Sequence, residues 1–205
     1  MITNHFCSVH LKSDPEYPGV RFFDDPVHEI ITPNDSVTVL DRRDIGLKLS
    51  VPEGAIQDEV NAPAQVEVHP CLRGPFKMPP GYEATSPIYM IKKQCKFQKD
   101  IKMEIEHFAS LKSTEDCEEM VFITAKSTPS YQGSHPVYNL QEVQDDGSHS
   151  RFTTGEQVGV ITFRELQPGP LGTARKSTKQ TQGTQAKSII CYDWTFDVSD
   201  CHSSV

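Results

Sequence analysis

The sequence predicts an all-β protein, an antiparallel β-sandwich of about eight or nine short strands with flexible ends. Apolar and polar residues alternate over several short segments, which places the apolar side chains on one face of a strand. The 15 prolines and 12 glycines are spread along the chain, as expected where turns separate many short strands. No segment keeps the 3.6-residue apolar period of an amphipathic helix.

The segment 44–56 is the strand around which we expect the rest to be arranged. Its aliphatic and polar residues alternate, with Ile45, Leu47, Leu49 and Val51 on one face and Gly46, Lys48 and Ser50 on the other. Pro52 cannot donate a ladder hydrogen bond, and Gly54 suits a turn with a positive φ. We therefore expect Leu47 and Leu49 to be buried and the chain to reverse direction after Pro52.

Further strands are predicted along the chain from the same signals. They cover residues 6–11, 36–40, 64–69, 86–92, 100–107, 120–125, 137–143 and 152–163. Residues 120–125 are apolar on both faces, which indicates a strand in the middle of the sandwich. Residues 70–81 contain four prolines and two glycines and are predicted as a long loop, residues 127–134 as a polar loop and residues 144–150 as a turn.

The chain divides into four parts on composition. Residues 1–29 are a turn-rich lead-in or the end of a preceding domain, and residues 30–166 form the sandwich. Residues 167–187 are polar and poor in aliphatic side chains, which predicts a flexible linker that a protease cuts first at Arg175, Lys176 or Lys179. Residues 188–205 are strand-like and hold the single tryptophan. They fit either the start of a truncated second β domain or a strand that covers an edge of the sandwich.

Composition argues against several classes of function. The formal net charge of -8 offers no general basis for binding nucleic acid. The six cysteines include no C-x-x-C pair, and no histidines stand near them at zinc-finger spacing, so we expect no metal or other cofactor. No run approaches the roughly 20 apolar residues of a membrane span. We expect a cytoplasmic chain without direct membrane insertion, or the cytoplasmic part of a larger membrane-attached protein.

Three short motifs in order resemble one known family. They read G-L-K-L-S-V-P-E-G-A-I at 46–56, T-S-P-I-Y at 85–89 and I-K-M-E-I-E-H-F-A-S at 101–110. In this order and at these intervals they are similar to the ZU-five domain of zonula occludens proteins, uncoordinated-type netrin receptors and ankyrins. The resemblance covers about residues 30–163 and does not distinguish these branches. It implies a structural role for the motif residues Gly46, Pro52, Gly54, Ser86, Pro87, His107 and Phe108.

The resemblance implies a protein-interaction module rather than an enzyme. Such domains are β-sandwiches that contact other proteins inside intracellular scaffolds or signalling-receptor tails. The ankyrin version binds spectrin through basic residues that have no counterpart in this acidic chain. The resemblance therefore implies an unidentified protein partner, and spectrin binding is not carried over.

A second hypothesis is a self-cleaving signalling fragment of the death-domain-associated type. Some relatives cut themselves at a His-Phe-Ser in a late strand, where this chain has Gln157, Val158 and Gly159. The partial matches are His107-Phe108-Ala109, with Ser110 one residue late, and His5-Phe6-Cys7 near the start of the chain. Neither supplies a nucleophile in the late strand, so we expect no catalytic residues.

Two groups of residues are candidate binding positions. Phe76, Met78 and Tyr82 lie in or beside the proline-rich loop, where aromatic and methionine side chains would supply contact area, unless the loop packs over the open end of the sandwich. The acidic cluster Glu115, Asp116, Glu118 and Glu119 would attract a basic partner, unless it is a solvated turn.

Overall fold

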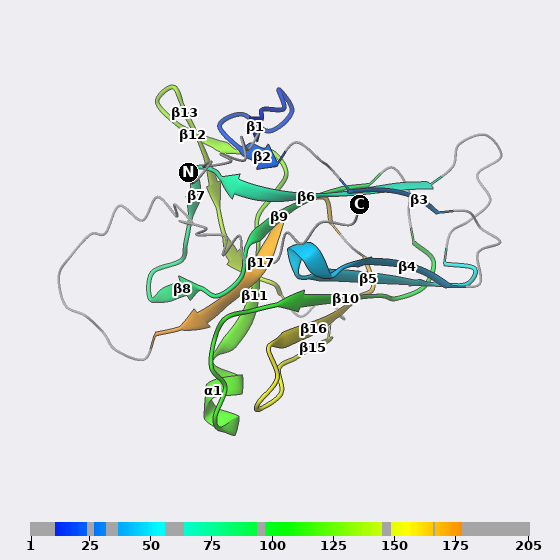
Figure 1. The fold of residues 1–205 in the computed structure, drawn as a ribbon. Helices are drawn as coiled ribbons and strands as arrows, with labels where there is room; N and C mark the ends of the chain where they lie inside the picture. The colour runs from blue at the N-terminus through cyan, green and yellow to red at the C-terminus, as the bar shows by residue number, and fades with distance from the viewer. Residues whose placement is uncertain are drawn as a thin grey trace, which may run out of the picture.

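The computed structural model describes residues 11–23, 27–31, 37–55, 64–93, 97–144, 149–165 and 167–177. Two antiparallel sheets pack face to face, and a small third sheet lies against the outer face of the larger one (Figure 1). The predicted antiparallel sandwich is confirmed. The described residues form seventeen strand segments, more than expected, because many are only two or three residues long and too short to show alternation.

The larger sheet has the strand order β1 (Leu11–Lys12), β2 (Arg21–Phe23), β6 (Ala64–Arg73), β9 (Ile88–Lys93), β17 (Gly169–Lys176), β11 (Met120–Thr124) and β14 (Gln141–Glu142). Two further strands, β3 (Val27–Ile31) and β8 (Tyr82–Ala84), pair with β6 and β17. The second sheet has the order β15 (His149–Arg151), β16 (Val158–Phe163), β10 (Ile101–Glu106), β5 (Leu47–Pro52) and β4 (Val37–Arg42).

The third sheet contains β12 (Ser130–Gln132), β13 (His135–Asn139) and β7 (Phe76–Lys77), of which β13 and β7 run parallel. The helical elements of the described residues are short, a 3-10 turn at Arg43–Ile45 and the helix α1 (Thr114–Glu118). Strands therefore build the whole described scaffold, and α1 lies at one end of it (Figure 1).

The strand predicted as the organising element is β5. Leu47 and Leu49 are 2% and 1% exposed, as expected from the alternation. The chain then reverses as predicted, because the Ala55 N–H donates to the Pro52 carbonyl at 3.0 Å and Gly54 has a φ of +66°. In the second sheet β5 lies between β4 and β10, and the Tyr89 hydroxyl of the larger sheet donates to the Ile45 carbonyl just before it.

The main core fills the space between the two sheets. It consists of Leu47, Leu49, Val51, Ala55, Val66, Val68, Tyr89, Ile91, Ile101, Met103, Ile105, Phe122, Ile161, Phe163 and Leu171. A second cluster lies on the other face of the larger sheet and includes Ile88 and Met90 of β9 and Val121 and Ile123 of β11. Both strands are thus buried on two faces, which confirms the prediction for residues 120–125.

The predicted loop at residues 70–81 is wrong in its first half. β6 runs through Pro70 to Arg73, and β7 follows at Phe76–Lys77. On one side of β6, β3 pairs as far as Val68 and β2 pairs from Cys71. Pro70 lies in the gap between those two partners, where its missing N–H breaks no ladder hydrogen bond. The predicted loop at 127–134 and turn at 144–150 likewise contain β12 and the first residues of β15.

The predicted linker is wrong for residues 169–176, which form β17 in the middle of the larger sheet. Small residues are required there, because a Cβ on Gly172 would lie 2.7 Å from Ile88 Cδ1 and 3.0 Å from the Pro87 carbonyl oxygen. The low aliphatic content thus reflects close strand packing, and because Arg175 and Lys176 lie in a paired strand, we no longer expect early cleavage there. Residues 178–187, with Lys179, lie outside the described residues, as do 1–10 and 188–205.

We predict that Leu49→Ala lowers the free energy of unfolding by about 2–5 kcal/mol, because the leucine is enclosed between the two sheets and its removal leaves a cavity. Urea denaturation measures the loss. Lys48→Ala, on the opposite face of β5, is the matched control and should change stability by less than about 1 kcal/mol. A loss below about 0.5 kcal/mol for Leu49→Ala would contradict the register of β5.

Candidate functional site

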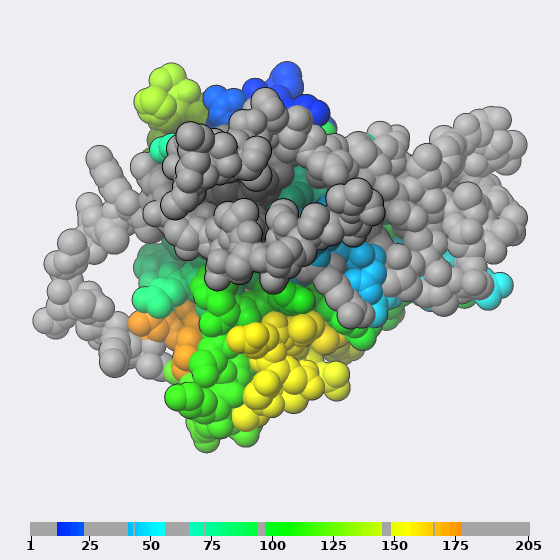
Figure 2. Space-filling view, in the orientation of Figure 1, coloured from blue at the N-terminus to red at the C-terminus, as the bar shows by residue number. Residues whose placement is uncertain are grey.

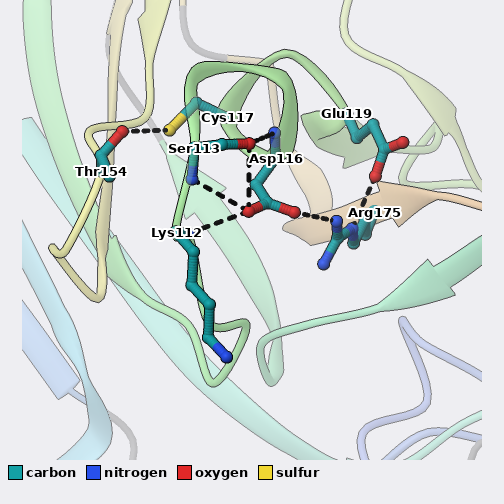
Figure 3. Close-up of polar contacts among 7 residues, drawn as sticks. All are labelled: Lys112, Ser113, Asp116, Cys117, Glu119, Thr154 and Arg175. Carbon is teal, nitrogen blue, oxygen red and sulfur yellow. Dashed lines mark hydrogen bonds and ion pairs between the residues drawn. The ribbon is translucent and has the colours of Figure 1, made fainter.

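The acidic cluster predicted from the sequence lies on α1 and its C-terminal cap. The Ser113 hydroxyl accepts a hydrogen bond from the Asp116 N–H at 3.2 Å, and the Asp116 carboxylate accepts one from the Ser113 N–H at 3.0 Å. This reciprocal capping box fixes a helix of one turn that would not be stable alone (Figure 3). We call Glu115, Asp116, Glu118 and Glu119 the acidic corner.

Arg175 of β17 joins the acidic corner to the larger sheet. Its guanidinium donates to Glu119 Oε2 at 2.8 Å and to the Asp116 carboxylate (Figure 3). The Glu119 hydrogen bond raises the pKa of Arg175, and the Lys112 N–H contributes most to lowering the pKa of Asp116. Asp116 and Glu119 are therefore committed to internal pairs, whereas Glu115 and Glu118 are exposed to solvent, with Glu115 also hydrogen-bonded to Ser113.

A groove of about 360 Å³ opens beside the acidic corner, and we call it the edge groove. It lies where β14, at the edge of the larger sheet, approaches β15, at the edge of the second sheet. Its lining comprises Glu118, Met120, Val121, Phe122, Glu142, Val143, Gln144, His149, Ser150, Ile161 and Lys176. Figure 2 shows residues 149–165, in yellow, beside the green segment around α1 at the lower edge of the molecule.

Tyr82 is connected to this groove through Glu142. The Tyr82 hydroxyl donates to Glu142 Oε2 at 3.1 Å, and Lys176 Nζ donates to Glu142 Oε1 at 3.1 Å. The half-buried Tyr82 thus lies close to the predicted acidic residues in space, although at least 33 residues separate them in the chain. The structure therefore brings Tyr82, but not the whole of its predicted group, to the same end of the sandwich as the acidic corner.

Phe76 and Met78 make no contact with the edge groove, although Tyr82 packs with them against the second cluster. Phe76 is 5% exposed, and its ring centroid lies 5.7 Å from that of Tyr138 in the second cluster. Met78 is half-buried and packs against the same cluster. Of the two interpretations of this region, packing against the sandwich describes it better than an exposed contact surface. Phe76 has almost no exposed surface for contact with a partner.

The family-motif residues have different environments. Ser86 is buried, and its hydroxyl accepts from the Thr173 N–H and donates to the Pro87 carbonyl, both at 2.8 Å. Gly46 adopts a φ of +70° immediately before β5. Phe108 is 58% exposed, so its side chain contributes little to the core.

His107 is buried beside the late strand. The residue is 4% exposed, and its backbone N–H donates to the Gln157 carbonyl at 2.8 Å. The centroid of its ring lies 5.7 Å from that of the Phe152 ring. Neither ring nitrogen makes a hydrogen bond within the described residues. Burial lowers the pKa of His107, and the nearby Ala109 carbonyl opposes that shift.

Sequence reasoning missed the residues that hold the site together, namely Arg175, Lys176 and Glu142. Arg175 and Lys176 fell in the predicted linker. Their positive charge, opposite to that of the acidic cluster, was the one feature of the sequence that could have indicated the pairing. In the portion of the chain that the structure describes, no group of three or more His, Cys, Asp or Glu side chains could hold a metal ion. No helix among these residues is long and apolar enough to cross a membrane.

Comparison with known proteins gives one family match. The model of the ZU5 domain matches residues 30–122, fewer than half of the 205 residues, and agrees with the resemblance seen in the three motifs. No curated protein matches the chain. The matched region ends inside β11, so β16 and β17 of the sandwich lie beyond it.

We predict that the buried His107 makes the fold less stable as the pH falls through about 6.5, the usual pKa of histidine in an unfolded chain. Because burial lowers its pKa, the unfolded chain binds the proton more readily, and the contribution of the neutral ring is fully present only above that pH. Urea denaturation at pH 7.5 and 5.5 measures the effect. His107→Gln should reduce the pH dependence, whereas replacement of the exposed His135 should not. An unchanged pH dependence in His107→Gln would contradict the role of this ring.

Proposed function

We propose that this chain is a non-enzymatic protein-interaction module of an intracellular scaffold or signalling-receptor tail. The match of residues 30–122 to the ZU5 domain is the basis of the proposal. The ZU5 family consists of protein-interaction domains, and this supports binding to a protein as the activity. The proposed setting is the cytoplasm, either for this chain itself or as the cytoplasmic part of a membrane-attached protein.

The observation that carries the non-enzymatic part of the proposal is the packing around Gly159. Self-cleaving relatives have serine at this place in the late strand. In this chain a Cβ at Gly159 would lie 2.4 Å from Phe152 Cε1 and 3.0 Å from Phe122 Cζ. The rings of Phe152 and Phe122 stack at 5.0 Å and fill the space that a nucleophilic side chain would need.

The histidine nearest to the late strand is also unsuited to be a base. A general base must reach the proton of its nucleophile by a hydrogen bond. The ring nitrogens of His107 contact no hydroxyl in the described part of the chain, and Ser110 is exposed to solvent. His5 and Cys7, the other partial match, lie outside the described residues.

The acidic corner supports a basic partner. Glu115 and Glu118 are exposed, while Asp116 and Glu119 are held in place by Arg175. Two exposed carboxylates on a rigidly capped turn favour a partner that presents lysine or arginine side chains. Such complementarity acts mainly on the association rate and on specificity, and it weakens with salt.

We predict that a basic protein captured by the wild-type chain in a cross-linking experiment is lost from the double variant Glu115→Lys/Glu118→Lys. Retention should also fall as the salt concentration rises, because exposed charges are screened. The matched control, Glu53→Lys/Asp100→Lys, makes the same change of charge at two exposed acids away from α1 and β17. Equal loss of the partner in both double variants would contradict binding at the acidic corner. Failure to capture any partner whose retention depends on salt would contradict the proposed function.

We predict that intact-mass spectrometry of the purified wild-type chain gives one species of 23.0 kDa. Gly159→Ser should also stay whole and lose about 1–3 kcal/mol of stability, because the added side chain overpacks the Phe152 site. Thr162→Ser, on the same strand, is the control. Two wild-type fragments that become one in Cys7→Ala or Ser110→Ala would establish the self-cleaving hypothesis instead.

A further inference from the structure

The acidic corner and the edge groove share one residue, Glu118. In the acidic corner, Asp116 and Glu119 pair with Arg175, and Glu115 is hydrogen-bonded at the start of α1. No hydrogen bond or ion pair engages the Glu118 carboxylate in the described part of the chain. Glu118 is also the one member of the acidic corner that lines the edge groove. The carboxylate that lacks a partner is therefore the one that lies at the groove.

The edge groove has a polar rim over a floor of core side chains. The rim consists of Glu118, Glu142, Gln144, His149, Ser150 and Lys176, all of them exposed or half-buried. On the floor, Met120 and Phe122 are only 4% and 2% exposed. Sites for apolar ligands are lined mainly by apolar side chains, so this rim suits a polar or charged group. The volume of about 360 Å³, near the lower end of the roughly 300–1,000 Å³ of ligand pockets, fits one side chain.

The charge of the rim favours a cation. Glu118 and Glu142 are its carboxylates and Lys176 is its ammonium group, so one negative charge is in excess when His149 is counted as neutral. Lys176 Nζ donates to Glu142 Oε1 and the Tyr82 hydroxyl to Glu142 Oε2, both at 3.1 Å. Glu142 is thereby compensated, and the excess charge belongs to Glu118. A cation would neutralise this carboxylate, whereas an anion would be repelled by it.

We propose that the edge groove receives one arginine side chain of the basic partner, with the Glu118 carboxylate as its main acceptor. Within the described residues no group of three or more His, Cys, Asp or Glu side chains could hold a metal ion, which leaves an organic cation. The inference rests on the proposed function, because it names the chemical group that the partner presents at this corner.

The arrangement of the acceptors selects a guanidinium over an ammonium group. Glu118 belongs to α1, Glu142 to β14 of the larger sheet and Ser150 to β15 of the second sheet. Acceptors thus face the groove from separate elements. A guanidinium spreads five N–H donors over a planar fork, whereas an ammonium group directs three from a single atom. The fork can therefore reach Glu118 and a second acceptor at the same time.

Peptide binding to the full chain tests this inference. The probes are fluorescein-labelled hexa-arginine and hexalysine, which carry the same charge, and fluorescence anisotropy at about 0.15 M salt gives each Kd while distant charges are screened. Hexa-arginine should bind the wild-type chain at least about fivefold more tightly than hexalysine. Glu118→Gln should weaken hexa-arginine binding about tenfold, the effect of losing a hydrogen bond between charged groups.

A second variant obstructs the groove without changing the charge. Ser150→Tyr places a large side chain in the groove from an exposed position, and it should also weaken hexa-arginine binding about tenfold. The matched controls are Glu115→Gln, which removes an exposed carboxylate of the acidic corner outside the groove, and Ser110→Tyr, at an exposed serine elsewhere. Both should stay within about twofold of the wild type. Circular dichroism and the urea midpoint establish that each variant is folded.

Four outcomes would overturn the inference. The first is no measurable binding of hexa-arginine, and the second is equal affinity for hexalysine. The third is unchanged affinity in both groove variants. The fourth is an equal loss in Glu115→Gln and Glu118→Gln, which would show that the acidic corner attracts cations as a general charged surface. In that case the proposed function would stand, because capture of a basic protein by cross-linking tests it separately.

Discussion

The close packing of β17 against β9 is the contact on which the rest of the sandwich depends. β17 pairs with β8, β9 and β11 and thereby connects the two halves of the larger sheet. Gly172 permits this approach, because any side chain there would meet Ile88 and the Pro87 carbonyl. The same strand supplies Arg175 to the acidic corner and Lys176 to the edge groove. A single eight-residue strand thus contacts both the acidic corner and the edge groove.

The half-buried strands could be predicted from the sequence because their apolar residues follow the strand period. In β5 and β10 every second side chain enters the core, and the residues between them face outward or are half-buried. β17 could not be found in this way. Six of its eight residues are buried, and glycine, alanine and threonine are among them. Such a strand has no alternation, and its composition is the same as that of a linker.

The candidate site could be predicted only in part, for a related reason. The acidic cluster is contiguous in sequence and was visible there, but its partner Arg175 is 59 residues from Asp116. The antiparallel pairing of Met120 with Arg175 brings the two together, and a single sequence contains no record of that register. Phe76 was misassigned because an aromatic residue in a proline-rich segment has the same composition whether it is exposed or packed against Tyr138.

The position of β17 also determines when the protein can fold during synthesis. It is the last described strand along the chain, yet it lies between β9 and β11, which are made about 50 to 80 residues earlier. Until it emerges from the ribosome, β9 and β11 each present an unpaired inner edge, and such edges favour association between chains. The region matched by the ZU5 family ends well before this strand. A nascent chain that contains only that region therefore lacks the strand that joins its larger sheet.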